Sequence, residues 1–219
     1  MSVNDYLQKI KECLVNMDLE GAKESAKKAL EAGANPQDII SRGIAEGMDI
    51  VGRKFEEGEY FLSELLVAGE IAKEILKILN PYIKSGEVKL KKLGKVVIGT
   101  VRGDLHDIGK NIVAMMLNAA GFEVIDLGAD VPPEKFVEAA RENDANIVAM
   151  SALLSVTMPE MKVVIEELRK AGLRDKVKVI VGGAPVTEEY AKEIGADGYG
   201  ENAIEGVKIC KSWMTRQNS

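Results

Sequence analysis

The chain has 219 residues, of which 46% are hydrophobic and 29% are charged, a composition typical of a globular protein with one large or two small domains. Its formal net charge of −6 argues against a nucleic-acid partner. No apolar run approaches the ~20 residues of a membrane span. The first residues, Met1–Tyr6, also lack the basic and apolar regions of a secretion signal. We therefore expect a cytoplasmic protein without a membrane or nucleic-acid partner.

The first third of the chain carries helical patterns only. Apolar residues recur there at spacings of three and four, which is the period of an amphipathic helix. Four helices with short connections predict an antiparallel bundle. We expect the first helix over Val3–Met17, the second over Leu19–Ala32 between a capping Asp18 and a terminating Gly33, the third from Pro36, and the fourth after Phe61.

A polar stretch with four lysines, Pro81–Leu93, separates this region from a different pattern. It lacks a long apolar period and is typical of a linker. We therefore expect a helical bundle domain over residues 1–84, a linker over 85–93 and a second domain over 94–219.

In the second domain, strand-like runs that are apolar on both faces alternate with helical segments. This alternation is typical of a parallel sheet covered by helices on both sides. It predicts an α/β fold with a doubly wound, flavodoxin-like (Rossmann-like) sheet of five strands in the order 2-1-3-4-5. The expected strands are Lys95–Thr100, Glu123–Asp126, Ile147–Ser151, Val177–Val181 and 196–199, and the expected helices are 111–120, 133–142, 158–171, 187–194 and 203–213.

The loop after the first strand holds the only histidine of the chain, His106. Two carboxylates, Asp104 and Asp107, flank it, and Gly103 and Gly109 allow the backbone to approach a bulky ligand. A carboxylate beside an imidazole is typical of an oriented metal ligand. One histidine cannot build a zinc site from protein groups alone, so a metal would arrive within a cofactor. The simpler alternative is a hydrogen-bonded histidine in a turn.

A phosphate-binding loop is the main rival for Gly103–Lys110. Five residues separate the two glycines of this stretch, whereas that motif requires four. Asn111 also stands where the motif requires Ser or Thr. We therefore reject a nucleotide site of this kind.

Three short motifs share a spacing that identifies a family resemblance. Asp104-x-His106-x-x-Gly109 is followed after 41 residues by Ser151-x-Leu153, and after 28 more by Gly182-Gly183. This pattern resembles the cobalamin-binding signature. Nearly the whole chain is similar to the small corrinoid proteins of methanogen and acetogen methyltransferase systems, and to the cobalamin module of methionine synthase.

The resemblance implies a cobalamin cofactor, carried as methylcobalamin, with His106 as the lower axial ligand of cobalt in place of the cofactor's dimethylbenzimidazole. Asp104 would be the partner of His106, and Asp107 a charge at a helix start. Asp104→Asn is then expected to shift the cobalt redox midpoint. The implied cofactor-binding residues are Gly103, Asp104, Leu105, His106, Asp107, Ile108, Gly109, Ser151, Leu153, Ser155, Thr157, Gly182, Gly183, Tyr199, Ala203, Phe61, Leu65 and Met48.

The resemblance also gives these residues roles. The hydroxyls of Ser151, Ser155 and Thr157 would bond the buried nucleotide tail and the corrin amides, and Leu153 would pack on the apolar ring of the tail. The side-chain-free Gly182 and Gly183 would keep a slot open for the tail. Tyr199 and Ala203 would close the slot. The bundle surface over the methyl group would carry Phe61, Leu65 and Met48.

The function implied is that of a methyl carrier. A substrate-specific methyltransferase would load the cobalt from methanol, a methylamine, a betaine or a methyl ether, and a second methyltransferase would deliver the methyl group to a thiol or folate-type acceptor. A reductive activation protein is a further expected partner. No second catalytic constellation is found, so the chain is expected to be a carrier and not an enzyme by itself. The alternatives are a cobalamin-dependent mutase subunit, a cobalamin sensor, and a flavodoxin-like binding protein without a corrin.

Overall fold

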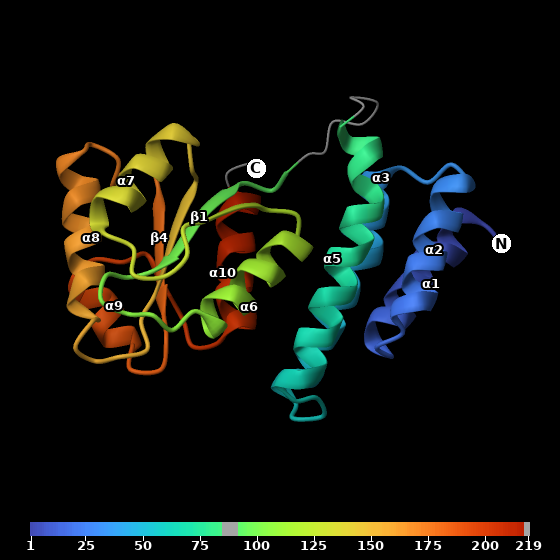
Figure 1. Ribbon diagram of the computed structural model, residues 1–219, viewed down its shortest axis with the longest axis horizontal. Helices are drawn as coiled ribbons and strands as arrows, with labels where there is room; N and C mark the ends of the chain where they lie inside the picture. Colours follow the sequence, from blue (N-terminus) through green and yellow to red (C-terminus); the bar gives the residue numbers. More distant parts are fainter. Residues whose placement is uncertain (85–91, 217–219) are drawn as a thin grey trace. The chain divides into compact units, whose positions relative to one another are not determined.

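The computed structural model describes residues 1–84 and 92–216. The chain divides into two compact units, Met1–Lys92 with Ala119–Gly121, and Leu93–Asn118 with Phe122–Ser219. Residues 85–91 of the expected linker lie outside the described residues. The first unit consists of helices, and the second contains all five strands together with further helices (Figure 1).

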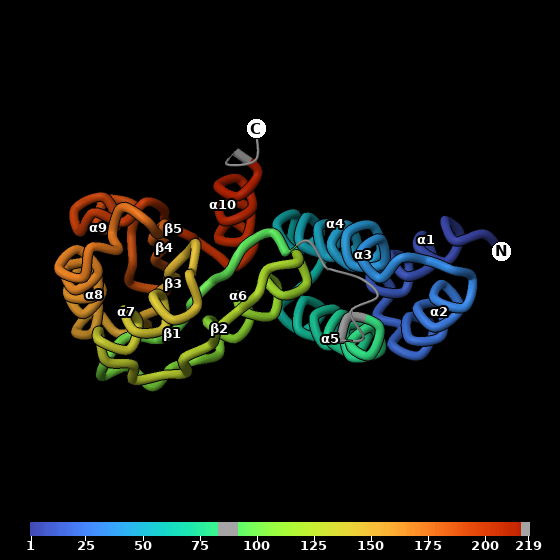
Figure 2. Tube along the Cα trace, turned by 90° about the horizontal axis from the view of Figure 1, so that it is seen from above, coloured from blue at the N-terminus to red at the C-terminus, as the bar shows by residue number. Residues whose placement is uncertain are grey.

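The first unit is a bundle of helices that lie side by side (Figures 1 and 2). Helix α1 packs against α2 and α4, and α5 packs against α2 and α4. Its core consists of buried aliphatic side chains such as Ile10, Leu14 and Ile75. The helices are α1 (Val3–Val15), α2 (Leu19–Glu31), α3 (Pro36–Asp38), the π-helix η1 (Ile39–Ala45), α4 (Glu46–Glu56) and α5 (Leu62–Lys84).

The helix starts follow from capping residues. Asp18 accepts a hydrogen bond from the Gly21 amide at 2.9 Å, and Asn35 accepts one from the Gln37 amide at 2.9 Å before Pro36. Two features differ from the sequence expectation. The third helix is interrupted by a π-helical segment, and α5 continues through Pro81, which was assigned to a polar stretch typical of a linker.

The second unit contains one parallel sheet in the order β2-β1-β3-β4-β5, which confirms the predicted doubly wound α/β fold. The central strands are buried because helices cover both of their faces. The strands are β1 (Lys95–Thr100), β2 (Glu123–Asp126), β3 (Ile147–Ser151), β4 (Lys178–Gly182) and β5 (Gly198–Gly200).

Helices α6 and α10 lie on one face of the sheet, and α7, α8 and α9 lie on the other (Figure 1). The second face is filled by a cluster around Phe136, which is fully buried. The helices are α6 (Ile108–Ala119), α7 (Pro133–Glu142), α8 (Pro159–Lys170), α9 (Glu188–Ile194) and α10 (Ala203–Arg216). Helix α6 begins three residues earlier than the sequence pattern predicted.

The topology gathers the loops that carry the three motifs. They follow β1, β3 and β4, and the carboxyl ends of neighbouring parallel strands meet at one edge of a sheet. Within residues 1–84 and 92–216, no helix combines the length and hydrophobicity that a membrane crossing demands.

Replacement of Phe136 by Ala should destabilise the second unit. The ring is 0% exposed and packs against Gly99, where an added Cβ would lie 2.8 Å from the ring. Loss of such a side chain leaves a cavity and lowers the free energy of unfolding by about 3–5 kcal/mol. Urea unfolding followed by circular dichroism measures this change. The control is Val137→Ala at the partly buried neighbouring position, and equal effects of the two substitutions would contradict the prediction.

Candidate functional site

The imidazole of His106 is fixed at one nitrogen and exposed at the rest of the ring. Its Nδ1 lies 2.7 Å from Asp104 Oδ1, and 52% of the side chain is exposed. An ionised carboxylate only accepts hydrogen bonds, so in the neutral ring Nδ1 carries the proton and Nε2 keeps its lone pair. The arrangement therefore provides one oriented nitrogen ligand at the carboxyl edge of the sheet.

Asp104 is fully buried and accepts hydrogen bonds from two loops. Its Oδ1 also accepts from the His106 amide at 3.1 Å, and its Oδ2 accepts from the Leu153 and Leu154 amides at 2.7 and 3.1 Å. Thr157 Oγ1 lies 2.9 Å from the same Oδ2. The carboxylate thus joins the loop after β1 to the loop after β3.

These hydrogen bonds explain the acidity of Asp104. Burial by itself would raise the pKa of the carboxyl group, because it disfavours the charged form. The hydrogen bonds from the His106 ring and amide, the Leu153 amide and the Thr157 hydroxyl outweigh burial and hold the pKa of Asp104 well below its ordinary value. Asp104 is therefore ionised at neutral pH.

The hydroxyl-bearing residues of the second motif do not share one role. Thr157 is 7% exposed, and its hydroxyl also lies 2.8 Å from the Leu154 carbonyl oxygen, so its only proton is used within the protein. The structure thus shows that Thr157 supports Asp104, and its bond to the cofactor stays a prediction. Ser155 is exposed and Ser151 is half-buried, so their hydroxyls stay predicted contacts.

Backbone atoms of neighbouring segments leave no room for a side chain at either glycine of the third motif. A Cβ at Gly183, whose φ is +130°, would lie 1.9 Å from the Ala152 carbonyl oxygen. A Cβ at Gly182 would lie 2.8 Å from the Gly200 carbonyl oxygen. Close packing of these loops requires both glycines, and the open slot for the cofactor tail stays a prediction.

Exposed apolar side chains lie in the histidine loop (residues 101–107, which carry His106), at the start of α6 and in the loop after β3. Large apolar residues are mostly buried in the sheet domain, so an exposed group on two adjacent loops indicates a surface for an apolar ligand. Sequence reasoning missed two members, although both stand in a visibly apolar loop. The exposed fractions are Leu105 75%, Ile108 69%, Leu153 45%, Leu154 39% and Val156 83%.

The other predicted positions are distributed along the same edge. Gly103 adopts a φ of +79°, Asp107 directly precedes α6, and Gly109 lies in its first turn with open space around it. Tyr199 lies on β5 and packs against the core cluster, where burial, Glu201 and Glu189 raise the pKa of its hydroxyl. Ala203 begins α10 and is half-buried.

The predicted bundle residues are divided between surface and core. Phe61 is 71% exposed, whereas Met48 is 4% and Leu65 is 1% exposed. Met48 and Leu65 thus pack inside the bundle and do not belong to its surface, which corrects the sequence prediction. Three residues that the sequence did not assign to the surface over the methyl group are exposed instead: Leu62 45%, Leu66 42% and Val67 45%.

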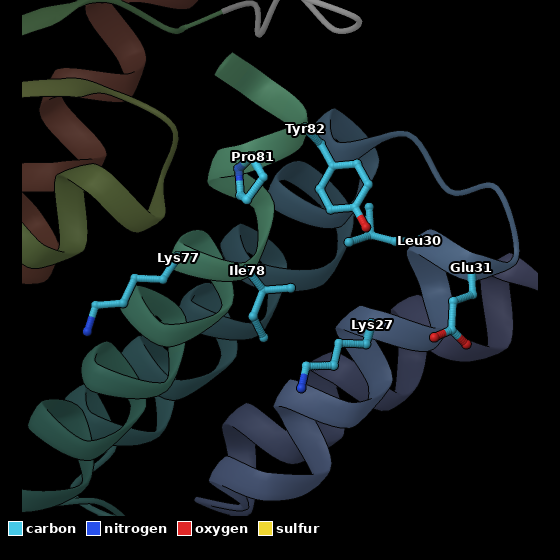
Figure 3. Close-up of a pocket in the computed structure, with 7 residues that line it drawn as sticks. All are labelled: Lys27, Leu30, Glu31, Lys77, Ile78, Pro81 and Tyr82. Carbon is cyan, nitrogen blue, oxygen red and sulfur yellow. The ribbon is translucent and has the colours of Figure 1, made fainter. Parts of the chain in front are cut away.

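A groove of ≈ 500 Å³ lies at the other end of α5 (Figure 3). Pro81 and Tyr82 of α5 and Leu30 of α2 contribute apolar surface to it, and none of the predicted cofactor residues lines it. The full lining is Lys27, Leu30, Glu31, Lys77, Ile78, Pro81 and Tyr82.

Across the described part of the chain, no group of three or more His, Cys, Asp or Glu side chains is arranged to hold a metal ion. A model of the B12 binding domain matches residues 94–208, and a second B12 binding domain model matches residues 6–80. The chain belongs to the B12-binding protein family. This membership agrees with the resemblance that the three motifs indicate.

The relatives extend the match over both units. The trimethylamine corrinoid protein of Methanosarcina barkeri is 46% identical over 208 residues, which cover 95% of this chain and 96% of the relative. A cobalamin-binding protein of Desulfitobacterium hafniense DCB-2 matches in structure with a TM-score of 0.79 and 38% identity, covering 94% of this chain and 98% of that one.

A third match comes from an assembly. A chain of the methanol:cobalamin methyltransferase complex MtaBC from Methanosarcina barkeri matches with a TM-score of 0.83 and 30% identity. The match covers 97% of this chain and 80% of that one. The shared fold confirms the predicted combination of N-terminal helices with a five-stranded parallel sheet.

Asp104→Asn should lower stability most strongly at neutral pH. Because the folded-state pKa of Asp104 is lowered, the ionised carboxylate stabilises the fold above the ordinary pKa of about 3.9. This contribution is lost as the pH falls toward the lowered value. We expect a loss of about 2 kcal/mol in the free energy of unfolding at pH 7, and a smaller difference from the wild type at pH 3.

Urea unfolding at a series of pH values measures both quantities. The matched control is Asp107→Asn, which removes an exposed carboxylate from the same loop. A difference between the Asp104→Asn variant and the wild type that stays constant from pH 7 to pH 3 would contradict the assignment.

Proposed function

We propose that the chain is a corrinoid methyl carrier in which His106 is the lower axial ligand of cobalt. The observation that carries this proposal is the His106–Asp104 pair. The hydrogen bond at Nδ1 directs the Nε2 lone pair outward on a half-exposed ring, and a second-shell carboxylate of this kind orients a metal-bound imidazole and raises its basicity.

The residues around His106 fit cobalamin. The exposed apolar side chains supply a surface for a large ring with apolar edges, and the single imidazole supplies one axial ligand. Bound cobalamin would supply the cobalt atom that accepts and donates the methyl group. Leu105 and Ile108 are the most exposed apolar residues of the histidine loop and its helix, so we assign them to the surface beneath the ring.

Asp104 has two roles in this proposal. It selects the ring tautomer of His106 through Oδ1, and it fixes the loop after β3 through Oδ2. Both interactions are made by groups of the protein itself, so the loops that carry Asp104 and Leu153 orient the imidazole. Thr157 supports both roles, since its hydroxyl donates to the same carboxylate.

The bundle contributes a second apolar surface. Phe61, Leu62, Leu66 and Val67 are exposed in and directly before the first two turns of α5. We assign to these four residues the predicted function of shielding the methyl group, in place of the buried Met48 and Leu65. The corresponding partners are a substrate-specific methyltransferase, an acceptor methyltransferase and a reductive activation protein.

A methylamine is the methyl donor that the comparisons favour. The trimethylamine corrinoid protein shares 46% identity with this chain, whereas the matching chain of the methanol complex shares 30%. The proposal is thus a carrier that receives its methyl group from a methylamine-specific methyltransferase.

The histidine ligand can be tested without a substitution because the chain contains one histidine. Protein labelled with ¹⁵N-histidine and loaded with cobalamin, then reduced to the cobalt(II) state, should show a two-line nitrogen splitting in its electron paramagnetic resonance spectrum. Unlabelled protein should show three lines, and His106→Ala should lose the histidine splitting. Three lines from the labelled wild type would assign the ligand to the benzimidazole and contradict the proposal.

Donor specificity can be tested by methyl transfer. The cobalamin-loaded, reduced protein should be methylated faster by a trimethylamine-specific methyltransferase than by a methanol-specific one, each supplied with its substrate. The methylation of the corrinoid is followed by its absorption spectrum. A methanol-specific enzyme that transfers faster would contradict the methylamine assignment, while free cobalamin serves as the control for transfer without the carrier.

A further inference from the structure

Asp130 adopts a backbone conformation that its position in a loop does not explain. Its φ is +54°, and the other described non-glycine residues with positive φ are Met17 and Asp144. Those two directly follow the C-caps of α1 and α7, where the left-handed conformation is common. Asp130 follows no helix and lies between β2 and α7. Such outliers persist where surrounding contacts impose them, and they cluster at functional sites.

Asp130 forms hydrogen bonds with two residues of the histidine loop. The Gly103 amide donates to Asp130 Oδ1 at 2.7 Å, and the Asp130 amide donates to the Asp104 carbonyl oxygen at 2.9 Å. The two hydrogen bonds enclose the peptide group between Gly103 and Asp104. They therefore fix the backbone from which the Asp104 carboxylate reaches His106.

The loop that carries Asp130 is itself anchored at its start. Lys110 is 2% exposed, and its Nζ lies 2.6 and 2.5 Å from the two carboxylate oxygens of Asp126. Asp126 Oδ1 also accepts from the Gly128 amide at 2.9 Å. The loop between β2 and α7 is thus bonded to α6 through Asp126 and to the histidine loop through Asp130.

We propose that Asp130 is a positioning residue for the axial ligand, acting through Gly103 and Asp104 on the orientation of the His106 ring. This inference rests on the proposed function, in which His106 binds cobalt. Asp130 acts by accepting a hydrogen bond from an amide, so an acceptor at this position is required and its negative charge is not. Loss of the acceptor frees the backbone before Asp104 and shifts the equilibrium toward cobalt without histidine.

The test compares two substitutions that both tolerate the left-handed conformation. Asp130→Gly removes the acceptor, whereas Asp130→Asn keeps a side-chain oxygen at the same place. Each variant is labelled with ¹⁵N-histidine, loaded with cobalamin and reduced to cobalt(II). The fraction of histidine-bound cobalt is read from the two-line nitrogen splitting, and cobalamin occupancy from absorption. Asp144→Gly is the matched control at the amino end of β3.

We expect Asp130→Gly to raise the ratio of histidine-free to histidine-bound cobalt by about fivefold, the effect of one hydrogen bond. Asp130→Asn should restore the wild-type ratio, and Asp144→Gly should leave it unchanged. The inference is overturned if Asp130→Gly leaves the ratio unchanged. It is also overturned if Asp130→Asn or Asp144→Gly shifts the ratio as much as Asp130→Gly does. None of these outcomes bears on the assignment of His106 as the ligand. Wild-type protein without the two-line splitting would overturn the histidine assignment and the inference with it.

Discussion

The geometry of the site depends on one buried carboxylate. Asp104 is fully shielded from solvent, and five hydrogen-bond donors from two loops surround its two oxygens. An ionised group in such a place is tolerated only when its hydrogen bonds are satisfied. Each donor is therefore constrained by the others, and the orientation of His106 follows from a network that extends well beyond the imidazole itself.

The fold of the second unit can be predicted from the sequence because short, periodic patterns of apolar residues mark its strands and helices. Strands buried on both faces are continuously apolar, and the flavodoxin-like order follows from their alternation with helices. The sequence motif also places Asp104 and His106 together, since a single residue separates them and the contact is made within one loop. Both features need only short stretches of chain.

Contacts between distant segments are less accessible to sequence reasoning. The direction of the Thr157 hydroxyl depends on a carboxylate 53 positions earlier, and the need for Gly183 arises from the backbone of another strand's loop. Asp130 carries no sequence signal of its left-handed conformation. In α5 the first turns are apolar on more than one face, so periodicity alone does not separate the buried Leu65 from the exposed Leu66.

The packing of Gly183 against Ala152 has an evolutionary consequence. Any side chain at Gly183 would collide with the carbonyl oxygen of Ala152, so natural selection has no gradual substitution available at this position. Diversification of the binding surface is then channelled to residues whose side chains meet solvent, such as Val156 and Leu105. Homologous chains that diverge in sequence would retain glycine at position 183 and accumulate their changes at such exposed positions.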